Sequence, residues 1–250
     1  MINFIASFAQ DSRLQYVMLL QSLTGVLATA LDGQNPDSGM TRSTMAVHAG
    51  ETSSLYLSRA EYDLHITVAA VIAGAIADAG MKNSTKITPE HLAVMLDNAD
   101  QVVEYLATRL RAIAVGNIAV IINELRRLRL TTSLLQISGT SRFGALMQAR
   151  MGRIGELRFI TPDSLGRKWR STDFVASMIS KDLMQLYVES FLYCAALDGD
   201  THAMVIYPDH DHEDNGMIFT IAGDEENTFD NIKDNIWHPH STAEVQRVHP

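Results

Sequence analysis

Apolar residues recur at helical spacing through most of the first 136 residues. In residues 1–30 they follow the three- and four-residue steps of a helix with one buried face. Helical spacing resumes near Tyr56 and continues to about Gly80. A third helix should begin at Thr88-Pro89-Glu90, where a threonine can cap the helix, proline suits its first position and an acid follows. It should run for roughly 45 residues, with Gly116-Asn117 as the candidate point for a break.

Two stretches interrupt this pattern. Residues 32–54 begin with turn-forming residues and continue with serine, threonine and glycine, so we predict a long loop that binds a partner or is ordered in an assembly. Residues 137–170 are rich in glycine and arginine and are interpreted as a connection of short turns or strands. Within it, Leu157 to Ile160 is a candidate strand.

The last third alternates between helix and strand. Ser171 can cap a helix that runs to Leu197 and stops at Asp198-Gly199. Residues 203–207 and 217–221 have strand-like patterns and are joined by a polar connection. The predicted fold class is therefore α+β, with a mostly helical part over residues 1–136 followed by a small helix-plus-β-hairpin module over residues 171–250.

The bulk composition is that of a globular protein. Hydrophobic residues make up 46% of the 250 residues and charged residues 20%, which argues against general disorder. The single cysteine, Cys194, excludes a disulfide framework within the chain and is expected to be a core residue. The start lacks the features of a secretory signal, and the most apolar runs, residues 67–77 and 112–122, are predicted to be buried helices and not membrane spans.

Charge is segregated along the chain. Residues 1–104 carry five Lys/Arg and eleven Asp/Glu, residues 105–170 carry twelve and three, and residues 171–250 carry three and fifteen. The basic middle could contact DNA or an acidic partner surface, whereas the alternative is a helix surface solvated by arginines. The candidate contact residues are Arg109, Arg111, Arg126, Arg127, Arg129, Arg142, Arg150 and Arg153.

Histidine is concentrated near the C-terminal end. Six of the nine histidines lie in the final 49 residues, and the densest segment is residues 209–214, with the sequence Asp-His-Asp-His-Glu-Asp. Imidazole and carboxylate groups are suitable ligands for a structural divalent metal such as zinc. The candidate ligands are His210, His212, His238 and His240. The alternative is a solvated acidic loop that binds no metal.

The usual motifs of phosphate-binding loops, dinucleotide-binding folds, serine hydrolases and zinc proteases are missing. We therefore expect no enzyme activity. The alternative is a small metal-dependent hydrolase that uses the His/Asp-rich loop, with Glu213 or Asp214 as the base. A third reading is a sequence-nonspecific DNA-binding protein, against which the net charge of −9 weighs.

The order of features from Gly166 onward resembles the C-terminal module of the Mu-type minor head proteins of tailed phages. The matching features are a glycine-basic segment with a tryptophan, a helix with a glycine stop, a strand, a histidine turn, a second strand and a His-Pro pair. In this chain they are Gly166-Arg167-Lys168-Trp169, residues 171–197, Asp198-Gly199-Asp200, Val205-Ile206-Tyr207, His210, Gly216-Met217-Ile218-Phe219, Gly223 and His238-Pro239. The resemblance covers about a third of the chain. Many family members have cysteines after the turn histidine and after the His-Pro pair, where this chain has histidines and acids.

The resemblance implies a low-copy virion protein that is incorporated into the phage head near the portal vertex, after synthesis in the host cytoplasm. Its implied role is head assembly, or packaging or ejection of the genome. The implied partners are the portal and capsid proteins, further copies of the same chain, and the packaged DNA through nonspecific contacts; no membrane is implied.

Overall fold

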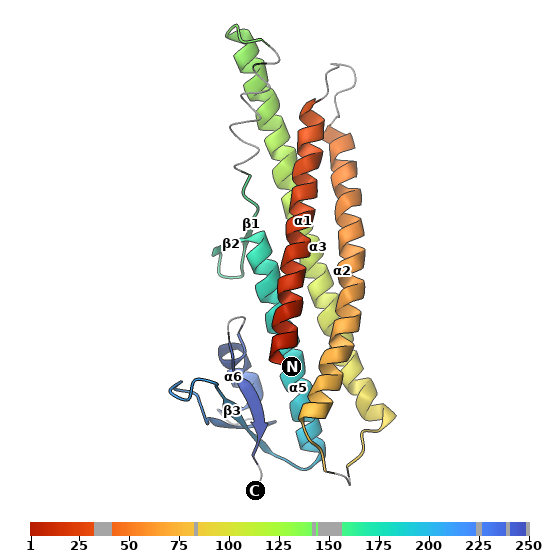
Figure 1. Ribbon diagram of the computed structural model, residues 1–250, viewed down its shortest axis with the longest axis vertical. Coiled ribbons are helices and arrows are strands. Elements are labelled where there is room, and N and C mark those ends of the chain that lie inside the picture. The colour runs from red at the N-terminus through yellow and green to blue at the C-terminus, as the bar shows by residue number, and fades with distance from the viewer. Residues whose placement is uncertain are drawn as a thin grey trace. The chain divides into compact units, whose positions relative to one another are not determined.

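The computed structural model describes residues 1–32, 42–82, 85–141, 144, 157–223, 227–238 and 241–248. The elements in chain order are α1 (Ile2–Asp32), α2 (Arg42–Asp78), α3 (Pro89–Ile137), β1 (Ile160–Pro162), β2 (Lys168–Arg170), α5 (Ser171–Leu197), β3 (His202–Ile206), β4 (Ile218–Thr220), α6 (Phe229–Ile236) and β5 (Glu244–Arg247) (Figure 1). Long helices come first and small antiparallel sheets lie near the C-terminal end, which confirms the predicted α+β class.

The loop predicted over residues 32–54 is shorter than expected, because α2 already begins at Arg42. Met45, Ala49 and Ser53 are buried at successive four-residue steps along this part of the helix. The prediction was wrong here because only Met45 of these three buried residues has a large apolar side chain, so the segment lacks the repeated large apolar residues that mark a helix in sequence. Residues 33–41 lie outside the described residues.

α3 continues through Gly116-Asn117 without the expected break. Asn117 is buried, and its side-chain amide takes part in two hydrogen bonds to other elements. These partners compensate for the cost of placing a polar side chain inside the protein. Asn117, which the sequence suggested as a point where the helix breaks, therefore lies inside the protein and hydrogen-bonds to other elements.

Two antiparallel sheets follow. β1 and β2 form a hairpin in which Ile160 pairs with Arg170 and Pro162 with Lys168, so the first strand starts at the end of the predicted 157–160 segment. The second sheet has the order β4-β3-β5. The predicted hairpin of β3 and β4 is confirmed, whereas β5 and the short helix α6 had no clear sequence signal.

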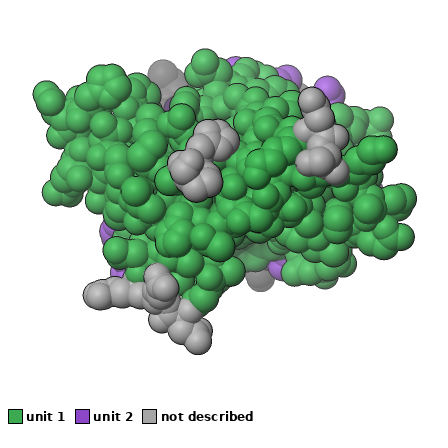
Figure 2. Space-filling view, turned by 90° about the horizontal axis from the view of Figure 1, so that it is seen from below, with its two compact units in different colours: residues 1–11, 61–106, 176–250 green, residues 12–60, 107–175 purple. Residues whose placement is uncertain are grey.

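The described residues form two compact units, which Figure 2 shows in green and purple. Unit 1 comprises residues 1–11, 61–106 and 176–250, and unit 2 comprises residues 12–60 and 107–175. Each unit therefore draws on segments that are distant in the sequence. The predicted three-part division along the chain stays a prediction.

Unit 1 contains the three-stranded sheet. Three aromatic rings pack against one another, with centroids 5.6 to 6.4 Å apart. They are Phe219 of β4, Phe229 at the start of α6 and Trp237 directly after α6. Trp237 is completely buried, and burial of such large aromatic side chains dominates core energetics.

Cys194 of α5 is also buried, as predicted, and burial raises the pKa of its thiol. A protonated, inaccessible thiol is a structural group and not a nucleophile.

Unit 2 contains a buried polar network centred on Asn117. The Asn117 amide donates to the Tyr16 hydroxyl of α1 at 2.7 Å and accepts from the Ser171 hydroxyl at 3.2 Å. Ser171 begins α5, and its hydroxyl shares a hydrogen bond of 2.8 Å with Thr161 of β1. Burial raises the pKa of Tyr16, so the phenol stays protonated. The network ties two long helices, the start of α5 and the β1–β2 hairpin to one another.

By length and composition alone, α2 and α3 each contain a segment that could cross a membrane. Buried helices of water-soluble proteins pass the same test. In both helices one side is buried against the rest of the chain, as Val71 and Ile72 of α2 and Ile121 and Leu125 of α3 illustrate.

We expect Asn117→Ala to lower the free energy of unfolding by about 1–3 kcal/mol, because the buried Tyr16 hydroxyl loses its donor and the Ser171 hydroxyl loses an acceptor. Urea denaturation followed by circular dichroism would measure the change. Asn123→Ala, at an exposed position of the same helix, is the matched control and should change stability by less than about 0.5 kcal/mol. Equal effects of the two substitutions would contradict a structural role for the network.

Candidate functional site

The predicted metal-binding loop is held by contacts of its own. The His212 ring stacks on Tyr207 with ring centroids 3.7 Å apart and an interplanar angle of 9°. Its Nδ1 accepts a hydrogen bond from the backbone N–H of Asp214 at 3.2 Å. Asn215 accepts from the backbone N–H of Tyr207 and donates to the carbonyl of His210. The loop is therefore ordered by stacking and hydrogen bonds, with one nitrogen of His212 already engaged.

Among the residues that the structure describes, no group of three His, Cys, Asp or Glu side chains is close enough to hold a metal ion. His210, His212 and His238 thus do not form a three-ligand site, and His240 lies outside the described residues. The structural zinc stays a prediction.

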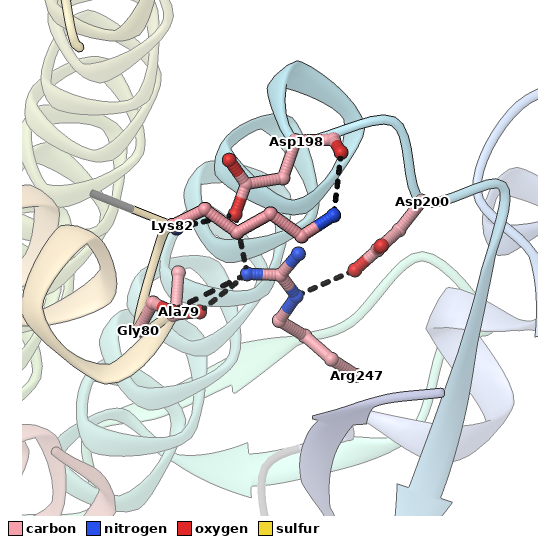
Figure 3. Close-up of polar contacts among 6 residues, drawn as sticks. All are labelled: Ala79, Gly80, Lys82, Asp198, Asp200 and Arg247. Atoms are coloured by element: carbon pink, nitrogen blue, oxygen red, sulfur yellow. Dashed lines mark hydrogen bonds and ion pairs between the residues drawn. The ribbon is translucent and has the colours of Figure 1, made fainter. Parts of the chain in front are cut away.

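The best-built polar cluster lies elsewhere, around the buried side chain of Arg247 in β5 (Figure 3). Its Nε donates to Asp200 at 2.5 Å, and its Nη1 donates to Asp198 at 2.7 Å. The same Nη1 donates to the backbone carbonyl of Ala79 at 3.1 Å and lies 3.5 Å from that of Gly80. One guanidinium group therefore joins the end of α2, the turn after α5 and strand β5.

Asp198 is the second centre of this cluster. Its side chain is fully buried and also accepts a hydrogen bond from the backbone N–H of Lys82 at 2.9 Å. Hydrogen bonds from the Thr85 hydroxyl, the Lys82 backbone and the Arg247 guanidinium lower the pKa of Asp198 to about 2, against the opposing effect of burial. The carboxylate is therefore charged at all physiological pH values and balances the buried arginine.

A cavity of about 460 Å³ lies next to this cluster, against strand β5. Its polar groups include Asp78, Glu244 and the Tyr187 hydroxyl, which donates to Asp78 at 2.9 Å. Burial, the hydrogen bond to Asp78 and the charges of Asp78 and Glu244 raise the pKa of Tyr187. Arg247 also lines this cavity, so its lining carries charges of both signs.

The predicted basic contact residues are on α3 where they are described. Arg111, Arg126, Arg127 and Arg129 are exposed, whereas Arg109 is partly buried with its guanidinium 6.0 Å from the Phe174 ring centroid. Arg127 lies 3.5 Å from Glu124. Arg142, Arg150 and Arg153 lie outside the described residues.

The structure adds basic residues that the sequence prediction missed. Arg158, Lys168 and Arg170 are exposed on or beside the β1–β2 hairpin, and the register places Lys168 and Arg170 opposite Pro162 and Ile160. Alternate residues of a strand point to the same side, so the two cations share one face of the hairpin. The spacing Lys168-x-Arg170 could have indicated this face if the strand had been recognised.

Charge also divides between the compact units. Unit 2 contains 15 Lys/Arg and seven Asp/Glu, a net charge of +8, and unit 1 contains five and 22, a net charge of −17. The buried Arg247 is one of the few cations of unit 1. Charge blocks of this size steer the association of a protein with oppositely charged partners.

Comparison with known proteins gives no relative: no family model, no curated protein and no solved structure matches the chain.

Arg247→Met should lower the free energy of unfolding by about 3–5 kcal/mol, because it leaves two carboxylates buried without their cation. Thermal and urea denaturation would measure the loss. Arg158→Met, which removes an exposed arginine, is the control and should be close to neutral. A small effect at Arg247 would mean that the cluster does not hold α2, α5 and β5 together.

The lowered pKa of Asp198 predicts how the free energy of unfolding depends on pH. Its folded-state pKa of about 2 lies below the ordinary value of 3.8, so its contribution is complete above about pH 5 and is lost as the pH falls through 3.8 toward 2. The difference in unfolding free energy between the wild type and Asp198→Asn should be constant at neutral pH and should shrink over this acidic range.

Urea denaturation at a series of pH values would measure this difference. Asp211→Asn removes an exposed carboxylate and serves as the control, for which the difference from wild type should stay small throughout. A difference for Asp198→Asn that does not change below pH 5 would contradict the assigned role of the charged carboxylate.

Proposed function

We propose that this chain is a structural component of a tailed-phage virion, a minor head protein or adaptor at or near the portal vertex. It acts without catalytic turnover in head assembly or in packaging or ejection of the genome. Its partners are the portal and capsid proteins and further copies of itself, and its basic residues make nonspecific contacts with packaged DNA.

The observation that carries the proposal is the order of sequence features from Gly166 to His238. The glycine-basic segment with Trp169 precedes helix α5, which ends at Gly199 with a positive φ of 91°. Strand β3, the loop containing His210, and strand β4 then follow in the same order as in the Mu-type minor head proteins. The sequence features that resemble the family thus coincide with helix α5 and strands β3 and β4 of this chain.

Two properties of the surface add support. Large apolar side chains are exposed on the helices, including Leu55 at 77% and Ile137 at 83% of their accessible area. Exposed apolar side chains contribute to a surface that contacts another protein where they lie together in one patch. The opposite charges of the two units would also suit a subunit whose neighbours differ in charge.

The Arg247 cluster fits a structural role better than a catalytic one. Its charged groups are buried and paired with one another, and the pairing leaves only Asp198 Oδ1 and Arg247 Nη2 of this cluster without a hydrogen-bond partner among the described residues. Tyr187 beside the cavity has a raised pKa, which makes it a poor base at neutral pH. General acid–base catalysis at neutral pH favours a pKa near neutrality, and the pKa values of Tyr187 and Asp198 are shifted away from it.

Quantitative mass spectrometry of gradient-purified particles of the encoding phage would test the proposal. We expect peptides of this chain at a fixed copy number close to that of the portal protein or a small multiple of it, and far below that of the major capsid protein. The major capsid protein in the same sample provides the internal standard. Absence of the chain from mature particles would overturn the assignment as a virion component.

A further inference from the structure

In the described part of the chain, β5 pairs with β3 alone and is therefore an edge strand of the three-stranded sheet. In β3, the N–H of Val205 donates to Met217 and its C=O accepts from Gly216, so both groups point to the side of β4. Successive residues of a strand direct their main-chain groups to opposite sides, so Met204 directs its groups toward β5. Met204 lies opposite Gln246, and this pair therefore carries hydrogen bonds between β3 and β5.

The same alternation places the main-chain groups of Val245 and Arg247 on the open side of β5. Among the described residues, none outside the sheet supplies a partner for their two N–H and two C=O groups. The opposite edge of the sheet differs, because the N–H of Thr220 in β4 donates to the carbonyl of Asn227. The free row of main-chain groups therefore lies on β5.

This free edge borders the cavity of about 460 Å³ next to the Arg247 cluster, whose lining belongs entirely to unit 1. All four residues of β5, from Glu244 to Arg247, line the cavity. A cavity over one face of a sheet would be lined by alternate residues, whereas a cavity along its edge is lined by consecutive ones. Ile2, Ala79 and Phe191 add apolar surface to the lining. The cavity thus offers apolar side chains beside unpaired main-chain groups.

We propose that this cavity is a docking site for an extended segment of a partner protein, which adds to β5 as a fourth strand. Two alternate residues of the segment pair with Val245 and Arg247, so three residues are enough to use all four free groups. In strand addition of this kind, main-chain hydrogen bonds provide affinity and side chains provide specificity. The inference does not rest on the virion role, because loss of peptide binding would leave the copy number expected in the particle unchanged.

The two faces of β5 specify the side chains of the segment. Val245 and Arg247 are buried, whereas Glu244 and Gln246 are exposed. Cross-strand neighbours share a face, so every second residue of the segment packs on the apolar lining and the residues between them lie beside Glu244 and Gln246. Glu244 has no ion-pair partner among the described residues, and unit 1 carries five Lys/Arg against 22 Asp/Glu. The expected segment therefore alternates apolar and basic residues.

Binding of a short peptide to the full chain is the first test. The probe is acetyl-Val-Lys-Val-Lys-Val-amide, and isothermal titration calorimetry would measure its affinity. One control peptide carries N-methyl groups on the valines, which removes the N–H donors, and a second has glutamate in place of lysine. Both controls should bind at least about tenfold more weakly. Equal binding of the N-methylated peptide, or no measurable binding of the lysine peptide, would overturn the proposal.

Hydrogen exchange at single amides, followed by NMR, locates the bound peptide. In the free protein the amides of Val245 and Arg247 should exchange fast, whereas the amide of Gln246 is protected by β3. The lysine peptide, at about ten times its dissociation constant, should slow exchange at Val245 and Arg247 about tenfold and leave Gln246 unchanged. Binding without this protection would overturn the proposal. Protection that rises with protein concentration in the absence of peptide would identify a second copy as the occupant and would also overturn it.

Charge reversal at the edge tests the choice of a basic segment. Glu244→Lys changes an exposed side chain, and it should weaken binding of the lysine peptide about fivefold and strengthen binding of the glutamate peptide. Asp211→Lys makes the same change at an exposed residue of the loop between β3 and β4 and is the matched control, for which neither affinity should change. Circular dichroism would verify that both variants are folded. An unchanged preference between the two peptides in folded Glu244→Lys would overturn the assigned partner chemistry.

Discussion

The arrangement of unit 1 depends on the charge balance between one arginine and two aspartates. Arg247, Asp198 and Asp200 are all buried, and burial of any of them without the others would be costly. The guanidinium also donates to the end of α2, so it fixes the chain at a point where three elements meet. The aromatic cluster of Phe219, Phe229 and Trp237 contributes to the apolar core beside the sheet, but it does not specify how β5 is aligned with α2. The ion cluster does this through directed hydrogen bonds.

In unit 2, hydrogen bonds between neutral side chains join the elements. Asn117 links Tyr16 and Ser171, and Ser171 links to Thr161. Neutral hydrogen bonds cost less to bury than ions, and they are equally directional. This network therefore uses none of the basic residues of the unit. In unit 1 the acids outnumber the bases, and one of the few bases is used inside.

Several elements were predictable from local sequence, and the contacts among them were not. Helix α5 was predicted from Ser171 to Leu197 because a capping serine and a left-handed glycine mark its two ends. The start of α2 was missed because its buried face is made of Met45, Ala49 and Ser53. The partners of Arg247 lie 47 and 49 residues away, and no short-range pattern records such a pairing.

The discontinuous make-up of unit 1 has a consequence for synthesis. Its segments come from the beginning, the middle and the end of the chain, and the hydrogen bond from Arg247 to Ala79 spans 168 residues. On the ribosome, the end of α2 emerges long before β5 is made, so the Ala79 carbonyl lacks its Arg247 donor until late in synthesis. Contacts between residues so distant in the sequence also tend to slow folding. Until residue 247 has left the exit tunnel, the nascent protein offers exposed surface to chaperones, and a chain cut short before β5 would remain in that state.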